Sequence, residues 1–519
     1  MRKLIGVSVA ALLAATACDR GPTLPGDKGA DAVAPKEVSA QELRAAVSDP
    51  RVKAFYEARG WKAAWNEDQA RELTEALREA PKHGLEAVQF LKEGDEAQNP
   101  VQREASLSLA AVSYADALAN GRVDPTKVTE LYTLPRAKAN VPAGLNQAIG
   151  NGGVAKWLAS LAPQDAEYKA LSDAFVRYSK AARGKAPQVA AGEALKPGDT
   201  DKRVPQIAEA LRINGYMPDQ QQASGGDGKQ KQAAAAPTRY AGALVEAVKR
   251  LQQDYGQDAD GVIGADTLKM LNTGAADRAR TLAINLERRR WLALELPETR
   301  IDVNTAAAFL QYWRDGKMAD ARRVVVGQPD WETPELGSPI TRLVANPPWN
   351  VPESIEQDEL AAKGAAYLAR NGFTRKDGRL VQAPGPDTAL GLVKFDMDNE
   401  HAIYLHDTPA KALFATNDRH SSHGCVRVHN AVQFAQLLAE HVGKRAEFDK
   451  ALASKKESSI DLPQQIPVRL LYHTAYLDNG RVLFREDAYG WDDKVGGALG
   501  LGAGNGRRAG RTHVSVFGP

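Results

Sequence analysis

The chain has 519 residues, too many for one hydrophobic core, since a single domain usually holds ~100–200 residues. Lys and Arg number 67 against 65 Asp and Glu, which gives a formal net charge of only +2. Such a neutral chain, with no basic stretch longer than Arg288-Arg289-Arg290, is a poor nucleic-acid binder, because phosphate binding needs clustered cations. Two cysteines, Cys18 and Cys425, exclude a disulfide framework and any site built from several thiolates. We therefore expect three or four folded units and no nucleic-acid partner.

The first 17 residues carry the features of an export signal. Arg2 and Lys3 precede an uncharged run of about 14 residues, which is too short to span ~30 Å of hydrocarbon as a helix. Ala15-Thr16-Ala17 places small residues directly before Cys18, which resembles the lipobox of bacterial lipoproteins, in which the cysteine is diacylated. The alternative is an ordinary signal peptide with a chance cysteine. The sequence thus predicts an exported, periplasmic protein anchored to the membrane by a lipid on Cys18, and Asp19 favours the inner membrane.

Two segments without catalytic features follow the signal. Residues 18–40 are rich in Gly, Pro, Ala and Asp without periodicity, which predicts a flexible tether. Residues 41–197 have apolar side chains at three- and four-residue steps, which predicts several amphipathic helices. We expect this second segment to be a helical scaffold domain.

A smaller helical unit is predicted at residues 198–275. Helical spacing of apolar residues begins at Val204 and again from Leu244 to Tyr255, with a polar loop expected between them at residues 220–236. Asp260-Gly261-Val262-Ile263-Gly264 then supplies a tight turn before a third helix. This pattern resembles the small three-helix peptidoglycan-binding domain. A generic helical bundle without a ligand is the alternative.

From residue 300 the pattern changes from helices to strands. A connecting helix is expected at residues 276–299, and a mostly-β domain at residues 300–490. Short apolar or alternating runs mark the strands: Ile301–Val303, Phe309–Trp313, Val324–Gly327, Gly391–Phe395, Ile403–Leu405, Leu470–Tyr472 and Val482–Phe484. Arg314-Asp315-Gly316-Lys317 predicts a hairpin turn between two of them. The predicted fold class is therefore multidomain α+β.

Three further elements are expected in and after the β domain. Residues 350–388 mix loops with a helix from Glu359 to Ala369. A second helix is expected to begin with Asn430 as its N-cap. The last segment, residues 491–519, is predicted to be a Gly-rich tail that is disordered after Gly496.

Cys425 lies in the part of the sequence that is richest in histidine. Five of the nine histidines lie between residues 401 and 429, among them His406. A lone cysteine with a histidine nearby is typical of a nucleophile and its general base, because the imidazole can take the thiol proton and return it to a leaving amine. The backbone at Gly424 could direct N–H donors toward a developing oxyanion. Arg427 has the fork geometry that holds a carboxylate.

His406 and the segment Ser422-His423-Gly424-Cys425-Val426-Arg427 resemble the signature of the L,D-transpeptidase (YkuD-type) catalytic domain. Gly385-Pro386, Ala389-Leu390-Gly391 and Ile403–Pro409 are similar to the large, multidomain YcbB branch of that family. The order of scaffold, peptidoglycan-binding module and catalytic domain is also typical of that branch.

The resemblance implies a role for each residue of the motif. Cys425 would be the nucleophile and His406 the proton donor and acceptor, with a backbone carbonyl near Asp407 orienting the imidazole. Residues 350–388 would form a lid over the site. The remaining roles would be oxyanion stabilisation by Ser422, His423 and Gly424, and substrate binding by Arg427 and Tyr404.

The resemblance also implies the reaction. Cys425 would attack the carbonyl between diaminopimelate and the terminal D-Ala of a tetrapeptide stem, and the thioester would pass to the side-chain amine of a second stem, forming a 3→3 cross-link. No cofactor is needed, carbapenems should acylate the thiol, and a D,D-carboxypeptidase would supply the tetrapeptides. Water or a protein lysine could replace the amine as acceptor, which would make the protein an L,D-carboxypeptidase or a protein-attachment enzyme.

Two other readings of the histidine-rich segment remain. His420, His423, Cys425 and His429 could bind zinc, but no second thiol or spaced carboxylate completes the usual ligand set, so we expect no metal. A non-catalytic lipoprotein that only binds the cell wall would require an inactive Cys425 and His406.

Overall fold

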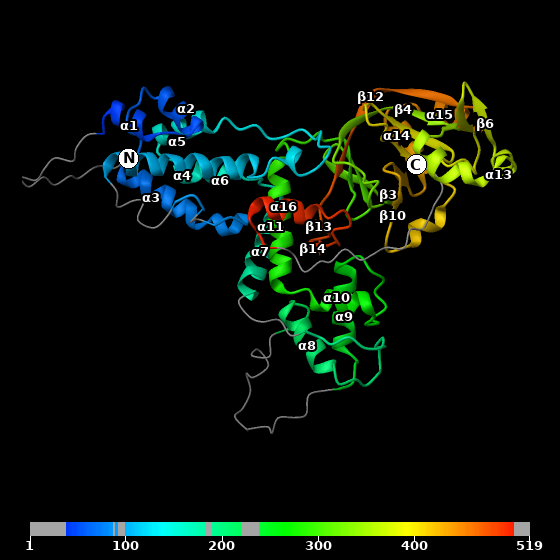
Figure 1. Cartoon of the computed structure of the whole chain (residues 1–519), viewed down its shortest axis with the longest axis horizontal. Coiled ribbons are helices and arrows are strands. Elements are labelled where there is room, and N and C mark those ends of the chain that lie inside the picture. The colour runs from blue at the N-terminus through cyan, green and yellow to red at the C-terminus, as the bar shows by residue number, and fades with distance from the viewer. Residues whose placement is uncertain (1–37, 87–88, 92–98, 183–187, 219–237, 503–519) are drawn as a thin grey trace, which may run out of the picture.

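The computed structural model describes residues 38–86, 89–91, 99–182, 188–218 and 238–502. Seen down its shortest axis, the molecule is T-shaped, with N-terminal helices and a β domain forming the bar and α8–α10 forming the stem (Figure 1). The predicted signal peptide with Cys18, most of the tether and the polar loop at residues 220–236 lie outside the described residues. None of the described helices is both long enough and apolar enough to cross a membrane.

The predicted helical scaffold is confirmed. Its longest helix, α4, begins at Pro100, a position where the missing N–H of proline costs no hydrogen bond, and buries Leu107 and Val112. α3 begins with a capping box between Asn66 and Gln69. The scaffold helices are α1 (Ala40–Ala46), α2 (Pro50–Ala58), α3 (Glu67–Arg78), α4 (Pro100–Asn120), α5 (Val141–Asn151), α6 (Val154–Leu161) and α7 (Ala166–Ala181).

A three-helix module follows, as the sequence predicts. α8 (Val204–Ile213), α9 (Ala243–Asp254) and α10 (Ala265–Asn272) share one apolar core. The buried Gln252 of α9 fastens the turn before α10, because its amide nitrogen donates to Asp260 Oδ1 at 2.8 Å and its amide oxygen accepts the Gly261 N–H at 2.9 Å. Gly261 has a φ of +74°, which explains the glycine in the turn.

A single helix joins the parts of the molecule. α11 (Ala275–Trp291) packs against α4 and α7 of the scaffold and, later in the chain, against β13 (Ala475–Asp478). Most of its residues are buried. The last segment was expected to be a Gly-rich tail from residue 491, and this is wrong for its first nine residues. These form α16 (Trp491–Leu499), whose Val495 and Leu499 pack on Ile284 and Trp291 of α11.

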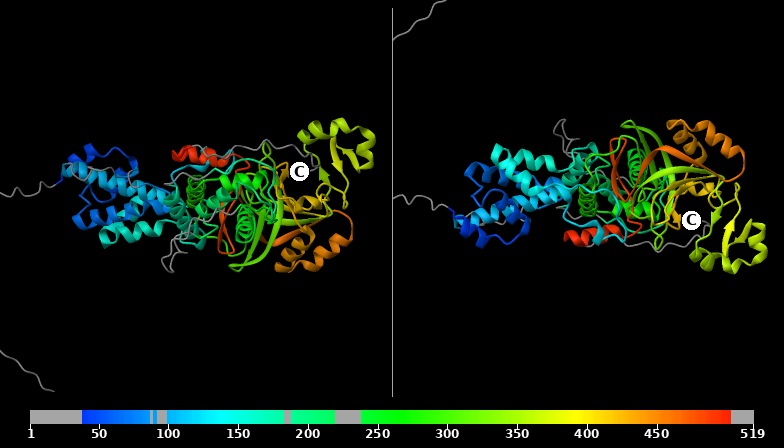
Figure 2. Two further views of the ribbon diagram at one scale, coloured as in Figure 1. Left: turned by 90° about the horizontal axis from the view of Figure 1, so that it is seen from below. Right: turned by 90° about the horizontal axis from the view of Figure 1, so that it is seen from above.

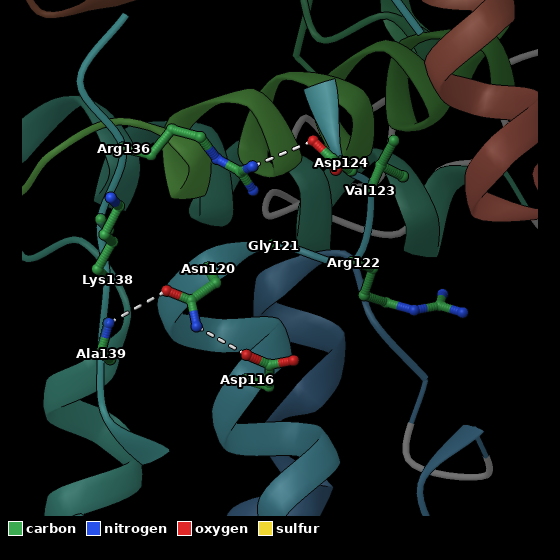
Figure 3. A pocket seen from close by; sticks show the side chains of 10 residues that line it. Asp116, Asn120, Gly121, Arg122, Val123, Asp124, Arg136, Lys138 and Ala139 are labelled. Atoms are coloured by element: carbon green, nitrogen blue, oxygen red, sulfur yellow. Dashed lines mark hydrogen bonds and ion pairs between the residues drawn. The ribbon is translucent and has the colours of Figure 1, made fainter. Parts of the chain in front are cut away.

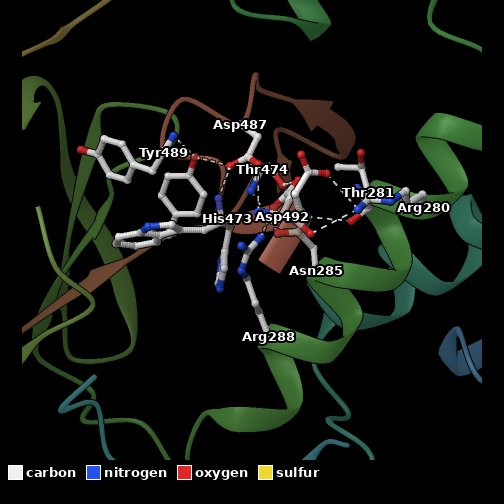
Figure 4. A network of polar contacts seen from close by, with 12 residues as sticks. Arg280, Thr281, Asn285, Arg288, His473, Thr474, Asp487, Tyr489 and Asp492 are labelled. Atoms are coloured by element: carbon white, nitrogen blue, oxygen red, sulfur yellow. Dashed lines mark hydrogen bonds and ion pairs between the residues drawn. The ribbon is translucent and has the colours of Figure 1, made fainter. Parts of the chain in front are cut away.

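A polar network fastens α16 to α11, as Figure 4 shows. Arg288 forms an ion pair with Asp492, and both side chains are buried. Thr474 donates from its hydroxyl to Asp492 Oδ2 at 2.7 Å and accepts from the Asn285 side chain at 2.8 Å. We call this network of Asn285, Arg288, Thr474 and Asp492 the joint.

The mostly-β domain is confirmed. Its nine-stranded sheet has the order β10-β3-β11-β9-β8-β4-β12-β1-β2, and β2 also pairs with β3, which closes the sheet into a barrel. The strands are β1 (Arg300–Asn304), β2 (Phe309–Arg314), β3 (Lys317–Gly327), β4 (Gly337–Ala345), β8 (Val393–Met397), β9 (Leu405–His406), β10 (His420–Ser422), β11 (Val426–Val428) and β12 (Ser458–Leu471). The predicted turn at Asp315-Gly316 joins β2 to β3, and the late hairpin is β13 (Ala475–Asp478) with β14 (Arg481–Phe484).

Two helices follow β11, and the start of the first one differs from the prediction. α14 (Ala431–His441) places Phe434 and Leu438 in the barrel core, and α15 (Arg445–Ala453) follows it. Asn430 precedes α14 but does not cap it with its side chain, because its backbone is left-handed with φ of 52°. A capping side chain needs an extended backbone at that position.

Residues 350–388, the segment predicted to be a lid and called the lid from here on, stand at the end of the molecule opposite the scaffold (Figure 2). The single helix expected from Glu359 to Ala369 is wrong, because Gly364, with a φ of +77°, separates a π-helical turn at Glu356–Leu360 from α13 (Ala365–Arg370). A small sheet, which the sequence did not predict, completes the lid: β5 (Trp349–Asn350), β7 (Arg379–Gln382) and β6 (Phe373–Lys376).

Candidate active site

A row of polar side chains crosses three neighbouring strands of the barrel. Lys394 on β8 lies opposite His406 on β9, and His406 lies opposite Arg427 on β11. Successive residues of a strand point to opposite faces, so these three share one face while Phe395, Leu405 and the valines of β11 enter the barrel core. The row therefore lies on the outer face of the barrel.

Cys425 lies immediately before β11, beside Tyr404. The Val426 N–H donates to the Tyr404 carbonyl oxygen at 3.1 Å, and the Cys425 Sγ lies 3.6 Å from the carbonyl oxygen of Ala402. The thiol is buried, with 5% of the residue exposed. Burial raises its pKa to about 11, although the Tyr404 N–H and hydroxyl and the cations Lys394 and Arg427 act in the opposite direction. The thiol is therefore protonated at neutral pH and needs a base to become a nucleophile.

His406 is fully buried and is held by the backbone of the next residue. Its Nδ1 lies 2.5 Å from the Asp407 carbonyl oxygen, so Nδ1 carries the proton and donates it. This leaves Nε2 as the basic nitrogen of the ring. The Tyr404 ring packs edge-on against the imidazole at 5.6 Å between centroids. His406 thus has the tautomer and the restricted orientation that a general base requires.

The Asp407 side chain has a different task from its carbonyl group. Its Oδ2 accepts the Leu392 N–H at 3.0 Å, and Oδ1 forms an ion pair with Lys411. Gly391 makes this approach possible, because a Cβ at that position would overlap the Asp407 carboxylate. The carboxylate therefore fixes the start of β8, and only the carbonyl oxygen contacts His406.

The turn before Cys425 is held by the hydroxyl group of Ser422, the residue that begins it. The Ser422 Oγ donates to the Cys425 carbonyl oxygen at 2.6 Å and accepts the Gly424 N–H at 3.3 Å. Gly424 has a φ of +104°, which favours glycine. Ser422 is therefore committed to shaping the turn, and the roles in oxyanion stabilisation of Ser422, His423 and Gly424 stay predictions.

Two residues that support this turn were not found from the sequence. Thr333 donates from its hydroxyl to the Gly424 carbonyl oxygen at 2.8 Å and accepts the Gly327 N–H at 2.9 Å. The Tyr489 hydroxyl donates to the Gly327 carbonyl oxygen at 2.7 Å, and Figure 4 shows Tyr489 at the edge of the joint. Neither residue belongs to a recognisable motif, so no sequence signal could have identified them.

The lid contacts the cysteine motif directly. Glu359 Oε1 lies 2.5 Å from His423 Nε2, and the Trp331 ring packs edge-on against the same imidazole at 5.1 Å. The apolar core of the lid, which includes Leu360 and Leu380, also packs against Tyr404. Glu359 was within the predicted lid but was not singled out as a site residue.

The histidines of the zinc alternative have other contacts. His420 lies 2.9 Å from an Asp418 carboxylate oxygen and 3.1 Å from the Thr305 carbonyl oxygen, and His429 packs against Phe414. Within the described ranges of the chain, no three His, Cys, Asp or Glu side chains are grouped as ligands for a metal ion.

A hollow of about 490 Å³ lies at the end of α4, and neither Cys425 nor His406 is among its lining residues (Figure 3). Both of its carboxylates are paired with arginines: Asp116 with Arg51 at 2.8 Å, and Asp124 with Arg136 at 3.1 Å. Its lining residues include no cysteine, serine or histidine that could act as a nucleophile or a base. The chemistry is therefore assigned to the region where residues 350–388 contact the barrel, around Cys425, His406, Arg427 and Glu359, and we call this contact region the cleft.

Comparison with known families assigns three parts of the chain. Residues 50–184 match the family described as "Scaffold domain", residues 200–271 that described as "Putative peptidoglycan binding domain", and residues 298–446 that described as "L,D-transpeptidase catalytic domain". These matches fall in the order that the sequence predicts. The resemblance to the YcbB branch stays a prediction.

One curated protein is similar to part of the chain. A "Putative L,D-transpeptidase" of Haemophilus influenzae is 35% identical over 241 residues, which is 41% of this chain and 48% of the relative. The chain thus spans about half the length of this curated relative.

Two solved structures are also similar. An L,D-transpeptidase of Stackebrandtia nassauensis is 14% identical, covering 57% of this chain and 100% of that chain with a TM-score of 0.21. The catalytic domain of an E. faecium L,D-transpeptidase acylated by ertapenem is also 14% identical, covering 34% and 99% with a TM-score of 0.20. Both scores are too low to define a shared fold, so the assignment depends on the family matches. Residues 298–446, which carry Cys425 and His406, are therefore an L,D-transpeptidase catalytic domain of the YkuD family, preceded in the same chain by a scaffold domain and a peptidoglycan-binding domain.

Proposed function

We propose that the protein is a peptidoglycan L,D-transpeptidase that forms 3→3 cross-links between stem peptides. The observation that carries the proposal is the pairing of β11 with β9, which brings the buried Cys425, immediately before β11, next to the strand that holds the oriented His406, in a domain that matches this family. The peptidoglycan-binding module in the same chain supports a cell-wall substrate.

The first half of the reaction forms a thioester. His406 takes the thiol proton of Cys425, and the sulfur attacks the carbonyl carbon that joins diaminopimelate to the terminal D-Ala. The C–N bond then breaks, and the imidazolium returns the proton to the leaving amine of D-Ala. The high pKa of the buried thiol fits this order, because no resting thiolate is present to react with other electrophiles.

The second half transfers the acyl group. The side-chain amine of a second stem attacks the thioester carbonyl carbon and the C–S bond breaks. The proton that the amine loses passes through His406 to the sulfur, which restores the thiol. Arg427, fully buried beside His406, would bind a carboxylate of the stem.

The proposed location follows from the N-terminal sequence alone. An export signal before Cys18 supports secretion to the periplasm, and lipidation of that cysteine would hold the enzyme at the inner membrane beside its substrate. A D,D-carboxypeptidase would act before it, because the donor stem must end in a single D-Ala. Cys18→Ser should move the protein from the membrane fraction to the soluble fraction.

The test of the proposed function compares wild type with Cys425→Ala, both lacking residues 1–18. Purified tetrapeptide-bearing fragments are incubated with each protein, and D-Ala, tripeptide and cross-linked products are measured by mass spectrometry. Wild type should release D-Ala and form the cross-link, and it should gain the mass of one carbapenem. The alanine variant should do neither. D-Ala release by Cys425→Ala would show that the nucleophile is wrong, and an inactive wild type would favour a binding-only protein.

A further inference from the structure

Glu359 is a lid carboxylate that the reaction described so far does not use. One of its oxygens, Oε1, lies 2.5 Å from His423 Nε2. The other, Oε2, is buried and has no hydrogen-bond partner among the residues that the structure describes. A buried carboxylate oxygen without a donor is unfavourable in a native protein, so such a group calls for a physical reason.

The charges around Glu359 suggest that reason. The cations that act on the Cys425 thiol, Lys394 and Arg427, both belong to the barrel side of the cleft. The Lys394 ammonium lies 4.3 Å from the centroid of the Tyr404 ring. The Glu359 carboxylate raises the pKa of Arg427 from the other side of the cleft. Lys394 also pairs with Asp396 at 2.8 Å, so Arg427 is the main cation of the barrel wall, while the lid presents an anion next to the cysteine motif.

This division matches the two substrates of a transpeptidase. The donor stem ends in carboxylates, which the cationic wall attracts. The acceptor brings an alkyl amine, which is protonated at neutral pH because its ordinary pKa is ~10.4, and the same wall would repel it. An amine acceptor therefore needs an anion on the opposite side of the cleft. Water, which is neutral, does not need one.

We infer that Glu359 is the specificity-determining residue that binds the amine of the acceptor stem and so favours aminolysis of the thioester over hydrolysis. The inference depends on the proposed function and names the acceptor class of the same site, an amine-bearing stem peptide. An ammonium group donates one N–H to Oε2 and transfers its surplus proton through the carboxylate to solvent. The neutral amine then attacks the thioester carbonyl carbon, the C–S bond breaks, and the second amine proton reaches the sulfur through His406.

A simpler role for Glu359 is that of a latch, which only holds the lid against His423. A latch would affect every use of the cleft equally, including acylation by a carbapenem, whereas an acceptor site affects only the fate of the thioester. The ratio of cross-linked product to hydrolysed tripeptide separates the two roles, because both products arise from the same acyl-enzyme.

The experiment uses the protein without residues 1–18 and a tetrapeptide fragment that serves as donor and acceptor. Glu359→Gln should lower the ratio of cross-link to tripeptide by about tenfold or more, the loss expected for a charge-assisted hydrogen bond, and D-Ala release should persist. Glu359→Asp should restore part of the ratio. Asp358→Asn removes an exposed charge at the position before Glu359. It is the matched control and should leave the ratio unchanged.

Two results would overturn the inference. If Glu359→Gln keeps the wild-type ratio, the carboxylate does not select the acceptor. If it slows carbapenem adduct formation, D-Ala release and cross-linking to the same extent, Glu359 is a latch. A wild-type protein that releases no D-Ala would instead contradict the proposed function itself, so the two failures are distinguishable.

Discussion

Two clusters of buried charge, the joint and the cleft, shift the pKa of their arginines in opposite directions. At the joint, Arg288 is 1% exposed and pairs with Asp492; burial lowers its pKa, but Asp492 and Glu335 raise it by more. In the cleft, Arg427 is fully buried too, yet its pKa falls to about 10 because burial outweighs the raising effects of Cys425 and Glu359.

The difference shows what each cluster is organised to do. At the joint the protein supplies its own counter-charge, so the network holds α16 to α11 whether or not a substrate is present (Figure 4). In the cleft, burial is left partly uncompensated for Arg427 and for Cys425 alike. Groups perturbed in this way are typical of functional sites, because a bound ligand can add a compensating interaction. The comparison predicts that similar substitutions in the two clusters will have unlike consequences.

The largest effect is expected at the joint. Arg288→Met should lower the free energy of unfolding of wild type by about 3–5 kcal/mol, because it leaves the buried Asp492 without its counter-charge. Thermal melting followed by circular dichroism measures the loss. Arg288→Met combined with Asp492→Leu should recover much of it, since no charge is then buried alone. Losses that simply add in the double variant would show that the ion pair does not couple the two helices.

The same change in the cleft should spare stability and affect activity. Arg427→Met removes a cation whose burial is not fully compensated, so the melting temperature should change little. kcat/KM for the tetrapeptide donor should fall by about 10–100-fold, because a charge-assisted contact with a carboxylate is lost. Release of D-Ala is the assay. A melting temperature that falls as far as in Arg288→Met, with normal kcat/KM, would mean that Arg427 is a structural residue like Arg288.

The sequence predicts the cleft better than it predicts the joint, and chain distance explains why. His406, Cys425 and Arg427 belong to one short motif, and strand alternation alone then places them on one face. Thr333, by contrast, lies 91 residues from the Gly424 carbonyl group that it braces, and Asp492 lies 204 residues from Arg288. Contacts of this kind depend on tertiary packing, and a single sequence carries no local signal for them.

The wrong predictions about helices have local causes that tertiary contacts override. Gly496 and Gly497 lower helix propensity in the last segment, which hid α16. The first of them leaves room for the Arg280 guanidinium, which would have to shift if a Cβ were present. In the lid, Gly364 looked compatible with a helix by spacing alone, but its positive φ breaks it. The barrel and the three-helix module could be predicted because their apolar patterns are regular over many residues.

The smallest expected effect concerns Tyr404 and the reactivity of the thiol. Because burial raises the pKa of Cys425 to about 11, the thiolate fraction, and with it the rate of alkylation by iodoacetamide, should rise about tenfold per pH unit between pH 7 and 10. Tyr404→Phe removes a hydroxyl that stabilises the thiolate, so the pKa should rise further and the rate at pH 9 should fall by up to about tenfold.

The direction of the Cys425 pKa shift tests whether the cost of burying charge in the cleft is only partly offset by neighbouring groups, in contrast to the joint. A group whose pKa is raised by folding costs stability only above its unfolded pKa, so beyond about pH 9 wild type should lose more stability per pH unit than Cys425→Ala. Tyr367→Phe on the lid helix α13 serves as the control for removing a tyrosine hydroxyl nearby. An alkylation rate that levels off near pH 8 would mean that the thiol is compensated like Arg288. A faster rate in Tyr404→Phe would mean that the hydroxyl shields the sulfur and does not stabilise its charge.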